Sequence, residues 1–272
     1  MARTPNWEEM VPIKRSKNGL AYTVSGKEGG PLLVFANGLG GLQESWFYQV
    51  RAFADSHQTL TFDHRGNGRS AYREGPARME TYVEDLIEIL DEEGVDSADF
   101  VGISFGSRLL QVLTLHHPER VRSLTLCAGT AAPADPTGGS VLTGMGGMTV
   151  ERFMKELVPL LFGPAYVQAN RRRLEAFAKG RLRRPTDPRG LSMQWEAICH
   201  FDFREHLASI EKPVLILHGE EDRLTPIRAA EQLASGLPNA TLVRLKDVGH
   251  SPQVEAIDRF NAALSDFLGV GA

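Results

Sequence analysis

The sequence has little of three things that would point to a specialised class of protein. Its 272 residues include only two cysteines, Cys127 and Cys199, too few for a disulfide-held scaffold, and we expect both thiols to be reduced. No apolar run approaches the roughly 20 residues that a membrane-spanning helix needs. The net charge of −4 provides no basic excess for general nucleic-acid binding. These shortages predict a globular protein with neither nucleic-acid nor membrane partners. We expect it to be cytoplasmic, because its first ten residues contain no apolar core of a signal peptide.

What the sequence does contain is a regular alternation of strand and helix patterns. Six short runs rich in β-branched and aliphatic residues predict strands over residues 31–36, 59–63, 98–103, 121–126, 213–217 and 240–245. Most are too continuously apolar for a half-exposed sheet, so they are typical of parallel strands that are covered on both faces. Helical spacing of apolar residues predicts helices over residues 82–90 and 254–268. Such alternation favours right-handed crossovers and a doubly wound sheet.

Two segments depart from this alternation. Residues 11–25 predict a hairpin of two strands around Asn18-Gly19. Between about residues 129 and 207 there is no convincing strand, only a Gly/Pro-rich opening followed by helical patterns. We therefore predict an α/β fold with an eight-stranded, mostly parallel sheet. Its core comprises residues 1–129 and 208–272, and a helical cap, residues 130–207, is inserted before the strand at 213–218.

A glycine-flanked serine lies between a predicted strand and a predicted helix. The segment Gly102-Ile-Ser104-Phe-Gly106 has the pattern G-x-S-x-G, in which both glycines relieve crowding at a sharp strand-to-helix turn. The turn exposes the serine at the carboxyl edge of the sheet, where the start of the helix offers unpaired N–H groups to an oxyanion. We therefore expect Ser104 to be a nucleophile.

A serine nucleophile needs a base and an acid that orients the base. Asp222 follows the strand that ends at Leu217, and His250 follows the strand that ends at Leu245. Both are expected at the same sheet edge as Ser104, the edge at which open α/β sheets bind ligands. The chain order Ser104, Asp222, His250 is also the order that this topology requires. Taken singly, His250 could be a loop histidine and Asp222 a helix cap.

These motifs resemble those of the α/β-hydrolase superfamily over about residues 31–268. The segment Asp63-His-Arg-Gly-Asn-Gly-Arg-Ser70 is similar to the D-x-R-G-x-G-x-S loop of its cap-bearing serine esterase, enol-lactonase and haloperoxidase branch. We expect Asp63, Arg65 and Ser70 to hold this loop together and to have no catalytic role.

The resemblance also implies an oxyanion hole made of two backbone N–H groups, those of Leu39 and Phe105. The chain departs from relatives at Asn37, where His is usual. That substitution raises the question of whether Asn37 supports the loop or touches substrate. Two further departures are Ile103, where His is frequent, and Ser107, where Gly is common.

The residue type at position 104 separates several chemistries. Relatives that open epoxides or displace halide use aspartate there, so Ser104 favours attack on a carbonyl and formation of an acyl-enzyme. We expect no cofactor and no metal. His116-His117 is the only histidine pair, but adjacent residues point apart on a helix and no carboxylate cluster is nearby.

The predicted cap supplies apolar residues and an excess of positive charge. We expect part of the substrate pocket to come from Met145, Phe162 and Trp195 of the cap, together with Asn37 of the core. From residue 151 to residue 190 there are ten Lys or Arg against four acidic residues, a local charge of +6. This basic segment is interpreted either as a solvated outer face or as a guide for an anionic substrate.

The expected function is hydrolysis of small or medium-sized carboxylic esters, with a small-molecule ester or lactone as the partner. Two alternatives remain open: an enol-lactonase or C–C bond hydrolase that acts on a carboxylate-bearing substrate, and a small-molecule receptor with a vestigial triad. The residue after His250 is Ser251, where C–C hydrolases tend to have an aromatic residue. Perhydrolase activity is a further side reaction open to the same site. The sequence leaves homo-oligomerisation undecided.

The guiding role of the basic segment is testable by salt. If its field steers anions, kcat/KM for a carboxylate-bearing ester falls as salt is raised, because screening shortens the reach of surface charges. A neutral ester of the same length serves as the control in steady-state assays. An equal response of both esters to salt would contradict steering.

Overall fold

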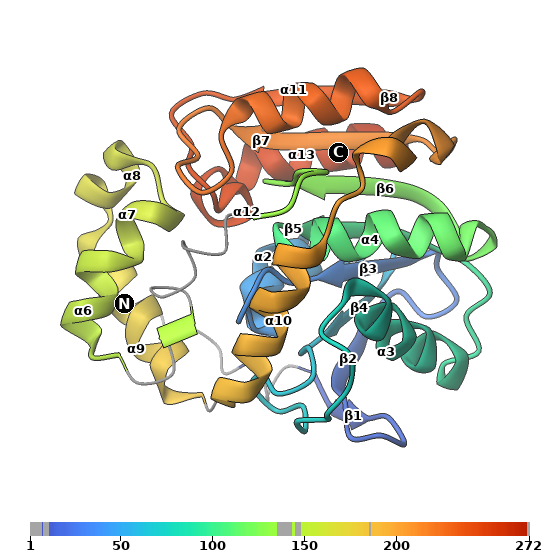
Figure 1. Ribbon diagram of the computed structural model, residues 1–272, viewed down its shortest axis with the longest axis horizontal. Helices are drawn as coiled ribbons and strands as arrows, with labels where there is room; N and C mark the ends of the chain where they lie inside the picture. Colours follow the sequence, from blue (N-terminus) through green and yellow to red (C-terminus); the bar gives the residue numbers. More distant parts are fainter. Residues whose placement is uncertain (1–6, 8–10, 135–142, 145–147, 185, 271–272) are drawn as a thin grey trace.

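The computed structural model describes residues 7, 11–134, 143–144, 148–184 and 186–270, and its centre is one eight-stranded sheet (Figure 1). The strands are β1 (Ile13–Arg15), β2 (Ala21–Gly26), β3 (Leu32–Ala36), β4 (Gln58–Phe62), β5 (Ala98–Ile103), β6 (Val121–Cys127), β7 (Val214–Gly219) and β8 (Ala240–Leu245). Their order across the sheet is β1-β2-β4-β3-β5-β6-β7-β8. The hairpin β1–β2 and the pair β2–β4 are antiparallel, and all the other pairs are parallel. The predicted α/β fold with a mostly parallel sheet is confirmed.

Helices cover both faces of this sheet. The helices of the core are α2 (Phe47–Phe53), α3 (Met79–Glu92), α4 (Phe105–His116), α11 (Ile227–Gly236), α12 (Pro252–Glu255) and α13 (Ile257–Leu268). Buried residues of α3, α4 and α11 pack on one face, and those of α2 and α13 pack on the other. Strands β3 and β7 are buried at every position because both of their faces are covered, which explains their continuously apolar sequences.

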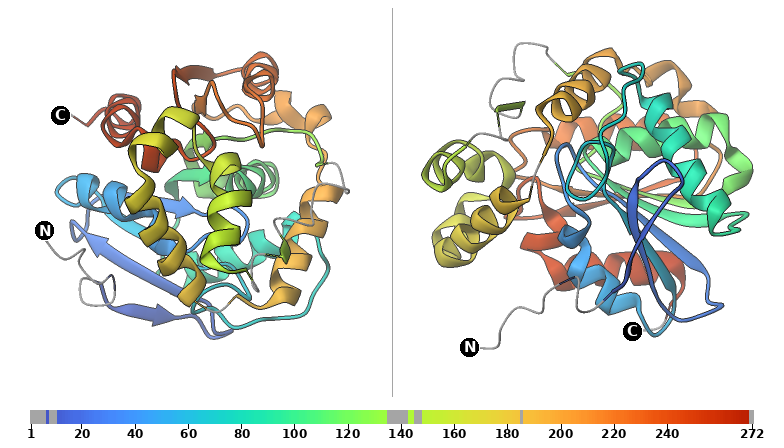
Figure 2. Two further views of the ribbon diagram at one scale, coloured as in Figure 1. Left: turned by 90° about the vertical axis from the view of Figure 1, so that its left-hand side faces the viewer. Right: turned by 90° about the horizontal axis from the view of Figure 1, so that it is seen from below.

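The chain between β6 and β7 forms helices, as the sequence predicts. They are α6 (Val150–Glu156), α7 (Val158–Leu161), α8 (Pro164–Ala169), α9 (Arg171–Arg183) and α10 (Pro188–His200), followed by a 3₁₀ turn over Arg204–Ser209. Helices α6–α9 stand to one side of the sheet and lie in front of it when viewed from that side (Figure 2).

These inserted helices divide into two groups by their packing. Helices α6, α7 and α9 supply most of a second hydrophobic cluster, centred on Phe153, Leu157 and Leu174. Helix α10 joins both clusters, because its Leu191 packs into this one while Met193 and Ala197 pack into the main cluster of the core. Helix α10 therefore packs against the core although it belongs to the insertion. The domain boundaries at residues 130 and 207 stay a prediction.

The helix predicted over about residues 254–268 is confirmed as α13 over Ile257–Leu268, but it starts later than predicted because the separate helix α12 ends at Glu255. The chain leaves helical geometry at Ala256, whose φ is −130° and ψ is 50°, between α12 and α13. Just before this break, the Glu255 carboxylate accepts hydrogen bonds from the backbone N–H groups of Gly163, Gly249 and Ser251. These tertiary bonds accompany the break, and apolar periodicity contains no sign of them. No helix in the described part of the chain is both long and apolar enough to cross a membrane.

Two glycines allow α4 to begin directly against the sheet. A Cβ atom at Gly102 would lie 2.6 Å from the carbonyl carbon of Gly106, and a Cβ atom at Gly106 would collide with the Ala36 carbonyl oxygen of β3. Any side chain at either position would therefore push α4 away from β3 and β5. Because the obstacles are backbone atoms, rotation of a side chain cannot relieve them.

We expect Gly106→Ala to lower the free energy of unfolding by about 1–3 kcal/mol or more, since overpacking against backbone forces a shift. Urea denaturation measures this change. The matched control is Gly180→Ala in α9, where an added Cβ meets nothing within 4 Å. In that control the free energy of unfolding should rise by roughly 0.5–1 kcal/mol, because alanine has a higher helix propensity than glycine. Equal stability of the two variants would contradict the packing argument.

Candidate active site

Ser104 occupies a strained turn between β5 and α4. Its φ is 53° and its ψ is −105°, a combination that residues other than glycine rarely adopt. The turn is tied to the neighbouring strand by a hydrogen bond of 2.9 Å from Ser104 N to Cys127 O. Ser104 lines a cavity of about 580 Å³ that lies between the core and the inserted helices. The structure therefore presents this serine to a space that is large enough for a small organic ligand.

His250 and Asp222 meet across the two loops that follow β8 and β7. The Nδ1 atom of His250 lies 2.8 Å from Oδ2 of Asp222, and His250 lines the same cavity as Ser104. Oδ1 of Asp222 accepts hydrogen bonds from the backbone N–H groups of Leu224 and Thr225, at 2.9 and 2.8 Å. Burial by itself would raise the pKa of Asp222, but His250 and these hydrogen bonds hold it well below its ordinary value. The carboxylate is thus ionised and fixed in place, ready to orient the imidazole.

A second histidine, His218, contacts the same carboxylate. This residue of β7 is fully buried, and its Nε2 lies 2.7 Å from the Thr225 carbonyl oxygen and 3.4 Å from Oδ2 of Asp222. Because a carbonyl only accepts, Nε2 carries the proton and donates it. His218 therefore ties the Asp222 turn to the end of β7. Nothing in the sequence distinguishes His218 from any other polar residue at a strand end.

Glu255 is another residue that sequence analysis did not single out. Its carboxylate accepts hydrogen bonds from Gly249 N at 3.0 Å and Ser251 N at 3.2 Å, the residues on either side of His250. It also accepts one of 2.7 Å from Gly163 N of the insertion. Burial raises the pKa of Glu255 while these N–H groups lower it, and burial prevails. Its only sequence signal is an acidic residue four positions after Ser251, one beyond the usual place in a capping box.

The two expected oxyanion donors belong to two segments next to Ser104, the start of α4 and the loop that follows β3. Phe105 N begins α4, where the first N–H groups have no acceptor within the helix. Leu39 lines the cavity, and a Cβ atom at the preceding Gly38 would lie 3.5 Å from Cβ of Ser104. Among the described residues, none accepts a hydrogen bond from either amide. The arrangement fits an oxyanion hole, a role that stays a prediction.

Asn37 lines the cavity, but its side chain is engaged within the protein. Its Nδ2 donates to Phe62 O at 3.0 Å, and its Oδ1 accepts from Ser45 Oγ at 2.7 Å. Its carbonyl oxygen lies 3.0 Å from His64 Nε2, and burial lowers the pKa of His64 to about 4, so the ring is neutral at pH 7. These bonds favour support of the loop over contact with substrate.

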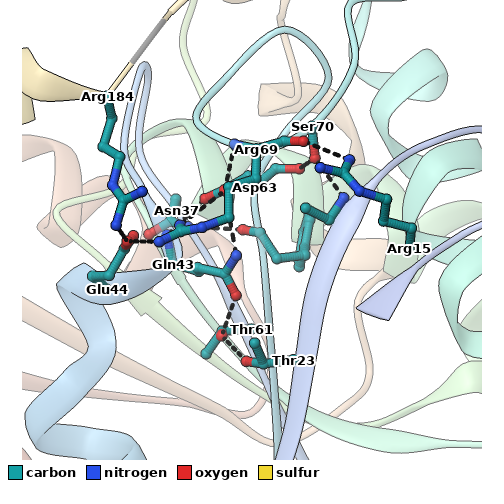
Figure 3. A network of polar contacts seen from close by, with 12 residues as sticks. Arg15, Thr23, Asn37, Gln43, Glu44, Thr61, Asp63, Arg69, Ser70 and Arg184 are labelled. Atoms are coloured by element: carbon teal, nitrogen blue, oxygen red, sulfur yellow. Dashed lines mark hydrogen bonds and ion pairs between the residues drawn. The ribbon is translucent and has the colours of Figure 1, made fainter. Parts of the chain in front are cut away.

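The loop from Asp63 to Ser70 is braced by its own polar side chains, as expected (Figure 3). Ser70 Oγ donates to Asp63 O at 2.6 Å and accepts from Ala21 N at 2.8 Å. Arg65 pairs with Asp85 through an Nε–Oδ2 contact of 2.6 Å. The Asp63 carboxylate accepts from the backbone N–H groups of Gln43 and Arg69, and burial raises its pKa to about 6. Since Asp63 is fully buried, it serves this network and does not reach the cavity.

The remaining pocket expectations have mixed outcomes. Phe162 lines the cavity, whereas Met145 lies outside the described residues. Trp195 is a correction: it does not line the cavity but packs with α10 against the main core cluster. Sequence alone does not distinguish a core-facing apolar residue of a helix from a pocket-facing one, because both positions take the same types of side chain. No group of three metal-binding side chains is found among the residues that the structure describes.

Comparison with known proteins places the chain in a family. A family model described as the alpha/beta hydrolase fold matches residues 31–257. The chain therefore belongs to the α/β-hydrolase fold family, and it is a hydrolase. Among curated relatives, “Putative carbamate hydrolase RutD” of Caulobacter sp. (strain K31) is 30% identical, over 92% of this chain and 96% of its own. The 3-oxoadipate enol-lactonase 2 of Acinetobacter baylyi is 28% identical, over 90% of this chain and 91% of its own.

A solved structure resembles the whole chain as well. The enol-lactonase of Burkholderia xenovorans LB400 superimposes with a TM-score of 0.85 at 27% identity, covering 95% of this chain and all of that one. The inserted helices fall within this coverage, so the similarity is not confined to the sheet.

The lowered pKa of Asp222 predicts how stability depends on pH. The folded carboxyl binds a proton less readily than the unfolded one, so Asp222 contributes stability above about pH 4 that is lost as pH falls further. We expect Asp222→Asn to reduce the free energy of unfolding most at neutral pH and progressively less in acid. Urea denaturation between pH 3 and 7 measures the difference. Ser107→Ala is the control. Because it removes no titrating group, its difference in free energy of unfolding from the unaltered protein should not vary with pH.

Proposed function

We propose that this hydrolase cleaves carboxylic esters of small to medium size through an acyl-enzyme on Ser104. In this proposal His250 is the general base and acid, and Asp222 orients His250. The N–H groups of Leu39 and Phe105 bind the oxyanion. Residues 130–207 form the cap that closes the substrate cavity.

The proposed reaction has two halves. Ser104 Oγ attacks the carbonyl carbon while its proton passes to Nε2 of His250, and the carbonyl oxygen becomes an oxyanion. Collapse of this intermediate breaks the ester bond, and the alcohol leaves with the proton from His250. A water molecule then gives its proton to His250 and attacks the acyl-enzyme. The acid is released, and Ser104 regains its proton.

One observation carries the proposal. The strained Ser104 turn and the Asp222-paired His250 open into the same cavity of about 580 Å³. Each feature alone has a structural explanation, but a strained serine that shares its cavity with a carboxylate-oriented imidazole fits the needs of acyl transfer. Because a receptor has no use for backbone strain at this serine, catalysis is favoured over a binding-only role.

Lactones and carbamates are the second candidate substrates. The comparisons favour them, since the relatives carry names of an enol-lactonase and a carbamate hydrolase. All three classes present a carbonyl carbon to the same nucleophile. An ester releases a separate alcohol, a lactone keeps its leaving oxygen tethered to the acyl group, and a carbamate also bears nitrogen on its carbonyl carbon. A panel with one ester, one γ-lactone and one carbamate of matched size would rank them by kcat/KM.

We expect Ser104→Ala to lower kcat on p-nitrophenyl esters by about 10³-fold or more, because loss of the nucleophile leaves only binding and the oxyanion hole. An activated phosphonate should label Ser104 in the unaltered protein, located by peptide mass spectrometry. Continuous turnover would separate an enzyme from a receptor, which stops after a first burst.

The matched control is Ser107→Ala, on the first turn of the same helix. Ser107 is buried beside Gly129 and does not line the cavity, so this variant should retain both labelling and turnover. Turnover that survives in Ser104→Ala would refute the assignment of the nucleophile.

A further inference from the structure

Three arginines from the inserted helices line the cavity that contains Ser104. They are Arg173 and Arg181 of α9 and Arg184 just after it. Among the described residues, Glu44 is the one carboxylate that lines the cavity. These three are among the ten basic residues of the basic segment, and the other seven do not line the cavity. The positive charge at the site is therefore local to three side chains.

Glu44 is already shared between two of its neighbours. Its Oε1 lies 2.6 Å from Nη2 of Arg69 and 3.5 Å from Nη2 of Arg184, and Figure 3 shows both arginines converging on it. Arg69 also lies 3.8 Å from the Asp63 carboxylate, whose raised pKa weakens its negative charge near pH 6. Glu44 and Asp63 thus have little capacity left for a further cation.

Arg181 differs from Arg69 and Arg184, because no carboxylate of the described residues is paired with it. Its guanidinium donates to the Gly40 carbonyl oxygen and, at 3.0 Å, to Oγ1 of Thr186, and both acceptors are neutral. No carboxylate among the described residues lies within 4.0 Å of it. Burial lowers the pKa of Arg181 to about 10, while Asp63 and Glu44 oppose that shift from farther away. The group is therefore charged at pH 7 and incompletely compensated, which is costly unless an anion joins it.

We propose that Arg181 binds a carboxylate of the substrate, so that the preferred substrates are anionic esters or lactones. This inference rests on the proposed function, because the carboxylate is assigned to the molecule whose carbonyl Ser104 attacks. Arg173 provides a second positive charge at the same cavity. It donates to Tyr48 Oη at 2.7 Å and stacks over the Tyr48 ring, without a carboxylate within 4.0 Å in the described part of the chain.

The position of Arg181 links anion binding to the reacting carbonyl. Its partner Gly40 follows Leu39, whose N–H is the expected oxyanion donor, and two residues span at most about 7 Å. The Gly40 N–H in turn donates to Oε1 of Gln194 at 3.0 Å. A short substrate can therefore reach both Ser104 and Arg181. The Gly40 carbonyl oxygen would repel an anion, so the carboxylate would take the donors of Arg181 that point elsewhere.

The first test uses the unaltered protein and matched methyl esters. Monomethyl glutarate and monomethyl adipate carry the carboxylate on the acyl side, and methyl pentanoate and methyl hexanoate are their neutral counterparts. The acetate ester of 3-hydroxypropanoate carries the carboxylate on the alcohol side, and propyl acetate is its neutral counterpart. We expect the charged ester of at least one side to exceed its neutral counterpart in kcat/KM by about 10-fold or more, as followed by pH-stat. Preference for the neutral esters throughout would overturn the proposal.

The second test changes the arginine. Arg181→Gln should lower the charged-to-neutral ratio of kcat/KM by about 10- to 100-fold, the value of a charge-assisted hydrogen bond, and Arg181→Lys should restore part of it. The matched control is Arg171→Gln on the same helix, whose 82% exposed side chain is paired with Glu175. It removes the same charge from outside the cavity. An equal loss for charged and neutral esters would make Arg181 a support of the Gly40 loop and overturn the inference.

These outcomes separate the two proposals. If neither charged nor neutral esters are turned over, or if Ser104→Ala retains turnover, then the proposed function fails. If Ser104 cleaves neutral esters but the ratio does not depend on Arg181, only the anion site fails. Should Arg181→Gln not fold, competition in the unaltered protein decides. Free glutarate must inhibit hydrolysis of methyl hexanoate more strongly than its neutral diamide, and equal inhibition overturns the inference.

Discussion

The close approach of α4 to β3 is the constraint on which the site depends. At Gly106 the helix backbone lies so near Ala36 that no side chain fits, and at Gly102 the strand backbone meets the helix in the same way. This contact forces the chain through Ser104 with a positive φ and leaves Phe105 N–H at the helix start. Because β3 continues into the loop of Leu39, the same contact sets that loop beside Ser104. The close contact between the backbones of α4 and β3 thus positions Ser104 and the two proposed oxyanion donors.

The polar residues around the site serve mainly to hold loops. Asp222 is held by two N–H groups and two histidines, and Glu255 holds the backbone on both sides of His250. Each carboxylate lies at a place where an irregular loop must keep one conformation without the regular hydrogen bonds of a strand or helix. Glu255 also bonds to Gly163, so the loop of His250 and the inserted helices are joined by one side chain.

The boundary between the core and the inserted helices is electrostatically uneven. On the core side, Glu44 and Asp63 compensate Arg69 and Arg184, while Arg181 relies on neutral acceptors. The overall charge of −4 conceals this asymmetry, because the basic segment carries +6 and the remaining residues carry −10. Seven of the ten basic residues of that segment do not line the cavity, and the proposed substrate choice depends on the three that do.

The sequence alone determined the order of the strands in the chain, the turn at Ser104 and the loops of Asp222 and His250. It could do so because the carboxyl ends of parallel strands share one edge, so position along the chain implies proximity in space. Only the tertiary structure decided that Trp195 faces the core, that the last helix breaks at Ala256, and that His218 and Glu255 brace the triad loops. It also singled out Arg181 among ten basic residues. Those outcomes depend on which side chains meet across distant segments, and apolar periodicity describes only one segment at a time.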